Sequence, residues 1–300
     1  MAEARSPLQS VANFRDVGQF CNDSLGTRLS TGIAARLITS QQAQDWFVVP
    51  QCSAWQRLVK DFGIKAIIDL RTKTEHIQQA QKHGARVQAS AAVPKTTDQV
   101  AEPIKLPGIH YHQINFNGSA FSRMLISKLT WLEFFRLIGL MVLGYRTDAI
   151  RVLAPYMEDM GLVGLATQSL DVCTHEVAQV FQVLAQPESW PLLVHCTQGK
   201  DRTGLVILLV LLLLNVDPEV VKKDYELSES ELASEMDERL HEISAIGLSR
   251  QFALCPSDLV PSVYSHILDK YGSVEQYLDQ AGVAKEHMDF VKRNLSADVS

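Results

Sequence analysis

Residues 191–214 read PLLVHCTQGKDRTGLVILLVLLLL and decide the fold. The first residues are a short apolar run typical of a buried strand, and residues 205–214 form an uninterrupted apolar run with the length of a core helix. A polar loop with a cysteine, a lysine, an aspartate and an arginine lies between them. So many polar groups between two buried elements cost free energy unless the loop binds something. The stretch therefore predicts a strand, a binding loop and a helix that begins near Thr203.

A second unit of the same kind lies earlier in the chain. Residues 63–70 read GIKAIIDL and predict a strand. Thr72 and Glu75 have the spacing of a capping box, which predicts a helix from there to about Gln81. Alternating strands and helices indicate an α/β fold with a central, mostly parallel sheet flanked by helices.

The two units place polar residues at the ends of their strands. In open α/β sheets, ligands bind outside the carboxyl ends of the strands. We therefore expect Asp69 and Arg71 to converge with residues 196–202.

Composition narrows the function classes. The chain has 300 residues, of which 46% are hydrophobic and 21% charged, so we expect a single globular domain over residues 1–300. The net charge of −6 argues against a nucleic-acid partner. Five scattered cysteines, none in a CxxC pair, favour neither a disulfide framework nor a zinc site and suit a reducing compartment. The N-terminus lacks an apolar signal segment, so the prediction is a cytoplasmic protein.

The remaining segments are predominantly helical. Residues 119–186 and 218–300 have helical patterns, the latter with breaks near Gly247, Cys255-Pro256 and Gly272, and residues 80–108 read as a long loop. Residues 124–145 predict one helix with a broad apolar face, which carries too many charges to span a membrane.

That apolar helix leaves two interpretations open. It packs against the sheet as an ordinary core helix, or residues 119–170 form a helical lid over the site. A lid would shield the cysteine of the polar loop, and its apolar face would make transient contact with a membrane surface when open.

The polar loop is not a nucleotide-binding loop of the Walker A type, because Val194 and Asp201 occupy positions that need glycine and serine or threonine. It contains instead Cys196, five residues, Arg202 and then Thr203. Wrapped at a helix N-terminus, the backbone N–H groups of such a loop point at an anion, and the arginine fork matches two phosphate oxygens. The same positive field favours the thiolate, which is a nucleophile beneath a bound phosphate.

The sequence HCTQGKDRTG of residues 195–204 resembles the signature loop of the cysteine-dependent protein tyrosine phosphatase superfamily. NFRDVG at 13–18, IDLR at 68–71 and YGSVEQYL at 271–278 are similar to the atypical branch typified by mycobacterial PtpB and related bacterial and fungal phosphatases. The resemblance implies a phosphocysteine intermediate, no metal or other cofactor, and helices inserted before the catalytic strand that cover the site.

Site roles follow from chemistry and resemblance together. Cys196 is the expected nucleophile rather than an inert core cysteine, and Arg202 the expected phosphate clamp. No Trp-Pro-Asp loop is present, so the general acid is Asp201, where a bound dianion favours the protonated carboxyl, or Asp69, whose alternative is a structural pair with Arg71. His195 supports the loop, and Thr203 caps the helix or stabilises the leaving thiolate. The other expected phosphate-binding residues are Thr197, Gln198, Gly199, Lys200 and Arg71.

Two function classes remain. The first is a metal-independent phosphatase for phosphotyrosine, also phosphoserine and phosphothreonine, or for phosphoinositides, with Lys200 either a solvated residue or extra charge for multiply phosphorylated substrates. The alternative is a non-catalytic module that recruits phosphorylated partners, which loss of Cys196 or Arg202 would have favoured. A rhodanese or an arsenate reductase is disfavoured by the Arg-Thr-Gly ending of the loop. Nothing in the pattern indicates an oligomeric state.

Overall fold

The structure, a computed structural model, describes residues 15–25, 33–35, 60–76 and 108–296. Its sheet has the strand order β1-β2-β5-β3-β4, in which β1 is antiparallel to β2 and all other neighbouring pairs are parallel. The strands are β1 (Arg15–Asp16), β2 (Ile33–Ala35), β3 (Ala66–Asp69), β4 (His110–Gln113) and β5 (Leu192–His195). β3 and β5 are buried throughout, as expected for parallel strands covered on both faces.

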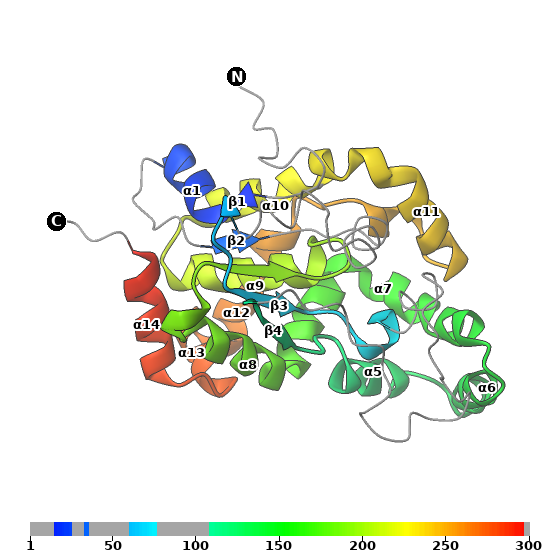
Figure 1. Cartoon of the computed structure of the whole chain (residues 1–300). Coiled ribbons are helices and arrows are strands. Elements are labelled where there is room, and N and C mark those ends of the chain that lie inside the picture. Colours follow the sequence, from blue (N-terminus) through cyan, green and yellow to red (C-terminus); the bar gives the residue numbers. More distant parts are fainter. Residues whose placement is uncertain (1–14, 26–32, 36–59, 77–107, 297–300) are drawn as a thin grey trace.

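Helices surround the sheet (Figure 1). The described helices are α1 (Val17–Leu25), α5 (Ser119–Ile126), α6 (Trp131–Val142), α7 (Arg146–Val172), α8 (Thr174–Leu184), α9 (Asp201–Leu213), α10 (Pro218–Glu231), α11 (Met236–Ala245), α12 (Leu259–Tyr271), α13 (Val274–Gln280) and α14 (Lys285–Leu295). Short 3-10 turns are η1 (Pro187–Ser189), η2 (Ala233–Glu235) and η3 (Arg250–Ala253). The predicted α/β class is confirmed.

Helix α9 forms the centre of the core. Every side chain from Leu205 to Leu213 is buried, and the helix contacts β5, α10, α13 and α14. At about 1.5–3 kcal/mol for each fully buried leucine, isoleucine or valine, this helix is a major source of stability. It therefore fixes the loop that precedes it. The helix begins at Asp201, two residues before the expected start at Thr203.

The helical character of residues 119–186 is confirmed, but a single helix over residues 124–145 is wrong. Helix α5 ends at Ile126, and α6 begins after Thr130. The break has a local cause: the Glu133 N–H donates to Thr130 Oγ1 at 3.4 Å, and the Thr130 N–H donates to Glu133 Oε2 at 2.9 Å. This capping box starts a new helix.

The segment 119–170 is not uniformly peripheral. Phe121 and Leu125 on α5, and Leu170 at the end of α7, belong to the main core. Helix α7 is interrupted at Gly161, where φ is +60° and ψ is −178°, so it consists of two helical halves. Helix α6 lies at the margin of the molecule (Figure 1). A lid role for residues 119–170, and a single domain over residues 1–300, stay predictions.

The C-terminal half is helical as far as Leu295, as predicted, with breaks at Gly247, at Cys255-Pro256 and at Gly272. Of the predicted loop at 80–108, residues 80–107 lie outside the described residues, as does the expected helix end at Gln81. Among the described helices, none has the length and apolar character needed to cross a bilayer.

Candidate active site

The loop between β5 and α9 folds around the sulfur of Cys196. The Gly199 N–H donates to Cys196 Sγ at 3.1 Å, and Cys196 is almost completely buried. Gly199 has φ of +64°, in the left-handed region where a side chain is strained, so glycine allows the turn that aims this N–H inward. A backbone donor directed at sulfur stabilises negative charge there.

The first turn of α9 adds further backbone donors beside the loop. The Gly204 N–H donates to the Lys200 carbonyl at 3.1 Å as the first turn of the helix closes. The N–H groups at the first turn of a helix have no partner within the helix and, with the helix dipole, attract anions. Thr203 Oγ1 is buried and has no hydrogen-bond partner among the described residues. The hydroxyl next to this helix start is therefore available to a ligand or to the sulfur.

Arg202 is held by a residue that the sequence analysis assigned only to a helix cap. Arg202 Nη1 lies 2.7 Å from Glu75 Oε2, and Nη2 lies 2.6 Å from Glu75 Oε1. Nη1 also donates to the Leu70 carbonyl at 3.1 Å, and Nη2 to Thr197 Oγ1 at 3.2 Å. These contacts use all four terminal N–H bonds. Within the described contacts, only the Nε–H of Arg202 remains to bind an incoming anion. For Arg202 to bind the anion with two N–H groups, Nη2 must release its hydrogen bond to Thr197.

Glu75 is itself strongly fixed. Its Oε2 accepts from the Thr72 N–H at 2.8 Å and from the Thr72 hydroxyl at 2.7 Å, which confirms the predicted capping box, and Thr197 Oγ1 donates to its Oε1. Burial alone would raise the pKa of Glu75, but the charge and hydrogen bonds of Arg202 lower it to about 2. The carboxylate is therefore ionised across the physiological range and serves to orient the arginine.

Replacing Glu75 by glutamine is expected to lower the free energy of unfolding by about 2 kcal/mol at pH 7, between the values for exposed and buried ion pairs. The effect depends on pH. A carboxyl whose folded pKa is depressed contributes stability that is complete above the unfolded pKa and is lost as the pH falls through the folded pKa. With values of about 2 folded and 4.5 unfolded, the wild type should lose about 1 kcal/mol of this contribution between pH 7 and pH 4.

Urea unfolding of both proteins at pH 7, 5 and 4 measures this difference. A Glu219→Gln variant is the control, because the Glu219 carboxylate lies 4.0 Å from Lys222 on the surface and should contribute less than about 0.5 kcal/mol. Two results would show that the pair with Arg202 does not stabilise the fold. One is a loss of unfolding free energy in Glu75→Gln as small as that of the control, and the other is a difference from the wild type that does not decrease at low pH.

The predicted convergence of the two strand ends is confirmed. β3 and β5 are neighbours with Asp69 opposite His195, and the Leu70 N–H donates to the His195 carbonyl at 2.8 Å. Asp69 and Arg71 form a buried bidentate pair, with Arg71 Nη2 2.6 Å from Asp69 Oδ2 and Nε 2.9 Å from Oδ1. The structural pairing proposed as the alternative role of Asp69 is thus present.

The charge states in this cluster are set by burial and by the ion pair. Burial lowers the pKa of His195 to about 4 despite the nearby Asp69, so the ring is neutral at pH 7. Burial opposes ionisation of Asp69, but His195 and the Arg71 guanidinium hold its pKa well below the usual range. Because His195 is itself neutral, Arg71 is the main partner. His195 Nδ1 lies 3.3 Å from the Cys196 carbonyl, which suits a role in supporting the loop.

Lys200 and Asp201 differ sharply in exposure. The Lys200 side chain is fully buried, and its Nζ donates to the carbonyls of Phe252 at 3.0 Å and Leu254 at 2.8 Å. The interpretation of Lys200 as a solvated residue is therefore wrong. Asp201 is about half exposed at the start of α9, with its Oδ1 3.5 Å from Lys200 Nζ. Lys200 thus ties the loop to η3 and lies beside the Asp201 carboxylate.

Two features of the site were missed in the sequence. Glu75 had a visible signal, the Thr-x-x-Glu spacing, but that spacing is fully explained by helix capping. The carbonyls of 252–254 carry no side-chain signal at all.

Gln198 is partly exposed in the loop. In the part of the chain that the structure describes, no three His, Cys, Asp or Glu side chains cluster as metal ligands would.

The Cys196 sulfur accepts a backbone N–H beside the start of α9, and Arg202 comes from the same loop, an arrangement that fits the phosphate-binding loop expected from the sequence. Comparison with protein families agrees: the model of the tyrosine phosphatase family matches residues 6–297. The chain belongs to the tyrosine phosphatase family, and phosphatase activity is the function that this membership supports. Comparison with curated proteins gave no match.

Proposed function

We propose that the protein is a metal-independent cysteine phosphatase that hydrolyses phosphate monoesters through a phosphocysteine intermediate. The contact between the Gly199 N–H and Cys196 Sγ carries this proposal, because it directs a backbone donor of the loop at the sulfur close to the N-terminus of α9. A phosphate held there by Arg202 lies directly above the nucleophile.

The first step transfers the phosphoryl group. The Cys196 thiolate attacks phosphorus, the S–P bond forms, and the P–O bond to the leaving group breaks while a general acid gives that oxygen a proton. The loop N–H groups and Arg202 stabilise the charge on the equatorial phosphoryl oxygens.

The second step releases phosphate. Water attacks phosphorus, its proton passes to the group that acted as acid, and the S–P bond breaks to restore the thiolate. The Thr203 hydroxyl is buried, and no described residue hydrogen-bonds to it, so it is suited to donate to the sulfur as the phosphoryl group leaves.

Asp201 is the better general acid. Its side chain is about half exposed at the start of α9, where a leaving group would depart, whereas Asp69 is buried in an ion pair with Arg71 that keeps it ionised. An aspartate locked as a carboxylate has no proton to give.

The proposed substrates are those of the atypical branch that the loop resembles: phosphotyrosine, together with phosphoserine and phosphothreonine or phosphoinositides. In the described conformation, Lys200 Nζ is committed to two carbonyls and to Asp201. Its contribution is therefore to fix the loop and the acid, and direct binding of a second phosphate group would require those contacts to break.

Replacing Asp201 by asparagine is expected to slow aryl phosphates with poor leaving groups by about 10²–10³-fold and those with strongly activated leaving groups by less than about tenfold. Only a poor leaving group needs the proton in the transition state. The measurement is kcat/KM across a series of substituted phenyl phosphates, all in EDTA, with vanadate as a competing anion.

An Asp69→Asn variant measured over the same series separates the two candidates. Its loss should be uniform across the leaving groups, because Asp69 supports Arg71 and the strand ends and donates no proton. A uniform loss for Asp201→Asn would remove that residue from the acid role, and activity that disappears in EDTA would contradict the metal-independent mechanism.

A further inference from the structure

Helix α6 exposes an apolar face that the phosphatase chemistry does not use. Among the described residues, all but one of the exposed large apolar side chains lie within residues 131–145, the exception being Leu268. Trp131 is 77% exposed, Phe135 63% and Val142 73%. A contiguous apolar surface of this kind indicates an interaction site.

Four of the eight exposed apolar residues within 131–145 align along one side of the helix. Trp131, Phe135, Ile138 and Val142 follow the i, i+4, i+7, i+11 spacing that aligns side chains along one side of a helix. The rings of Trp131 and Phe135 stack at a centroid distance of 6.1 Å, so the face is partly preordered.

The opposite side of α6 is firmly attached. Leu137 is buried against Ala149 and Val152 of α7, and the Tyr156 hydroxyl of α7 donates to Glu133 Oε2 at 2.6 Å. The helix is therefore seated on α7, and none of the described residues covers its outer face.

The net charge around this face is positive, opposite in sign to the net charge of the whole chain. Residues 119–151 contain five basic and two acidic residues, although the chain carries a net charge of −6. Arg123, Lys128 and Arg136 are exposed, and none forms a salt bridge with another described residue. An apolar helix face bordered by exposed basic residues is typical of helices that lie in the interface of an anionic membrane.

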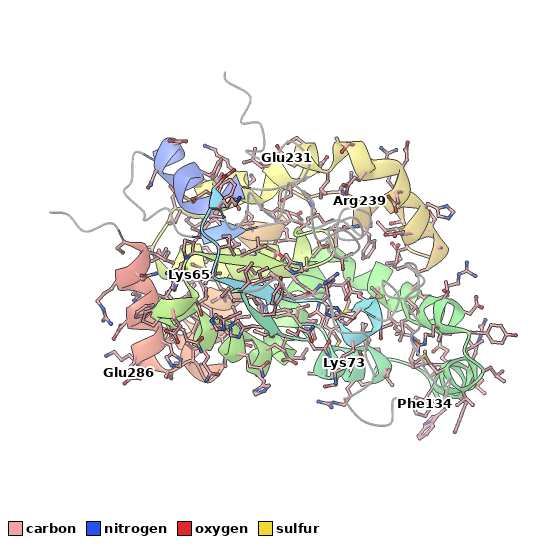
Figure 2. All side chains as sticks on the ribbon, in the orientation of Figure 1. Lys65, Lys73, Phe134, Glu231, Arg239 and Glu286 are labelled. Carbon is pink, nitrogen blue, oxygen red and sulfur yellow. The ribbon has the colours of Figure 1, made fainter. Side chains whose placement is uncertain are left out.

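Helix α6 lies on the side of the molecule toward which the carboxyl ends of the parallel strands point (Figures 1 and 2). In Figure 2, Lys65 precedes β3 and Lys73 follows it, and Lys73 lies toward the label of Phe134 on α6. The carboxyl ends of the parallel strands, where the Cys196 loop starts, therefore point to the side on which α6 lies. The first half of α7 links helix α6 to the catalytic loop. The Ser249 hydroxyl donates to Glu158 Oε2, and Ala154 belongs to one apolar cluster with Phe252 of η3. The Phe252 carbonyl in turn accepts a hydrogen bond from Lys200 of the loop.

We propose that the outer face of α6 docks the protein on an anionic lipid bilayer, with Trp131, Phe135 and Val142 in the interface and the neighbouring basic residues on lipid headgroups. A second copy of the chain is a poorer occupant, because pairing two such faces would bring like charges together. Docking is measured as binding, without turnover, so its failure is distinct from failure of the proposed phosphatase activity.

The test is co-sedimentation of the full chain with phosphatidylcholine vesicles that contain no or 30 mol% phosphatidylserine. We expect binding to the anionic vesicles, at least tenfold weaker binding of a Trp131→Glu/Phe135→Glu variant, and several-fold weaker binding of Lys128→Glu/Arg136→Glu or of the wild type in 0.5 M salt. Leu268→Glu and Lys285→Glu are matched controls on other helices and should bind as the wild type does. Circular dichroism verifies that each variant is folded.

Several results would overturn the proposal. These are absence of wild-type binding, equal binding of the Trp131→Glu/Phe135→Glu variant, or equal binding to neutral and anionic vesicles. Analytical ultracentrifugation adds a further arm: a wild-type dimer that the same variant dissociates would assign the face to a second copy of the chain.

Discussion

Replacing Cys196 by serine is expected to reduce kcat by at least about 10⁴-fold while inorganic phosphate still binds. A serine hydroxyl is not ionised at neutral pH and is a poor nucleophile without a base beside it, and neutral His195 is directed to a carbonyl and to Asp69. Phosphate binding persists because the Gly199 N–H, the α9 start and Arg202 are unchanged. Steady-state hydrolysis of an aryl phosphate and calorimetric titration with phosphate measure the two properties.

Cys173→Ser is the matched control for this variant. Burial raises the pKa of the Cys173 thiol to about 11, and its sulfur lies 3.4 Å from Asn117 Oδ1, a contact that a serine hydroxyl can keep. Its activity should remain within about twofold of the wild type. Residual turnover above 1% in Cys196→Ser, or loss of phosphate binding along with activity, would contradict a nucleophilic role separate from anion binding.

The strand, loop and helix around Cys196 were predictable because each depends on short-range information. The apolar run after the loop is too continuous for a surface helix, and the Cys-x5-Arg spacing fixes the loop length. The convergence of the carboxyl ends of β3 and β5 was also predictable, since ligands of open α/β sheets bind outside those ends. That the two strands are direct neighbours was not predicted.

The partners of the site were not predictable, because they depend on long-range contacts. Glu75 meets Arg202 across 127 residues of sequence, and Lys200 meets the Phe252 carbonyl across 52. Backbone carbonyls have no sequence signature, so the burial of Lys200 had no signal. The start of α6 did have one: Thr130 and Glu133 have the same capping spacing as Thr72 and Glu75, but the surrounding apolar run obscured it.

The same reasoning explains why the apolar residues of α6 left core packing and a lid both open as interpretations. Periodicity reports that a helix has an apolar face, and it does not report what covers that face. In the structure, α7 covers only the side of α6 that carries Leu137. The outer face is therefore a property of the tertiary arrangement.

Replacing Arg202 by alanine is expected to lower kcat/KM by at least about 10³-fold, equivalent to roughly 4 kcal/mol of transition-state stabilisation, and to weaken phosphate binding as well. Unlike Cys196, Arg202 holds the anion in the ground state and in the transition state. Arg202→Lys should still lose at least about 10²-fold, because a single ammonium cannot reproduce the planar fork. The measurements are kcat/KM for an aryl phosphate and calorimetric titration with phosphate.

Stability must be separated from chemistry in this variant, because Arg202→Ala leaves the ionised Glu75 carboxylate without its main partner. The double variant Arg202→Ala/Glu75→Gln removes that unpaired charge. We expect it to recover part of the unfolding free energy lost in Arg202→Ala but none of the activity, since the arginine fork is still absent. If the double variant regains activity together with stability, or if Arg202→Lys works as well as the wild type, Arg202 serves as the structural partner of Glu75, and the phosphate must be held by the loop N–H groups alone.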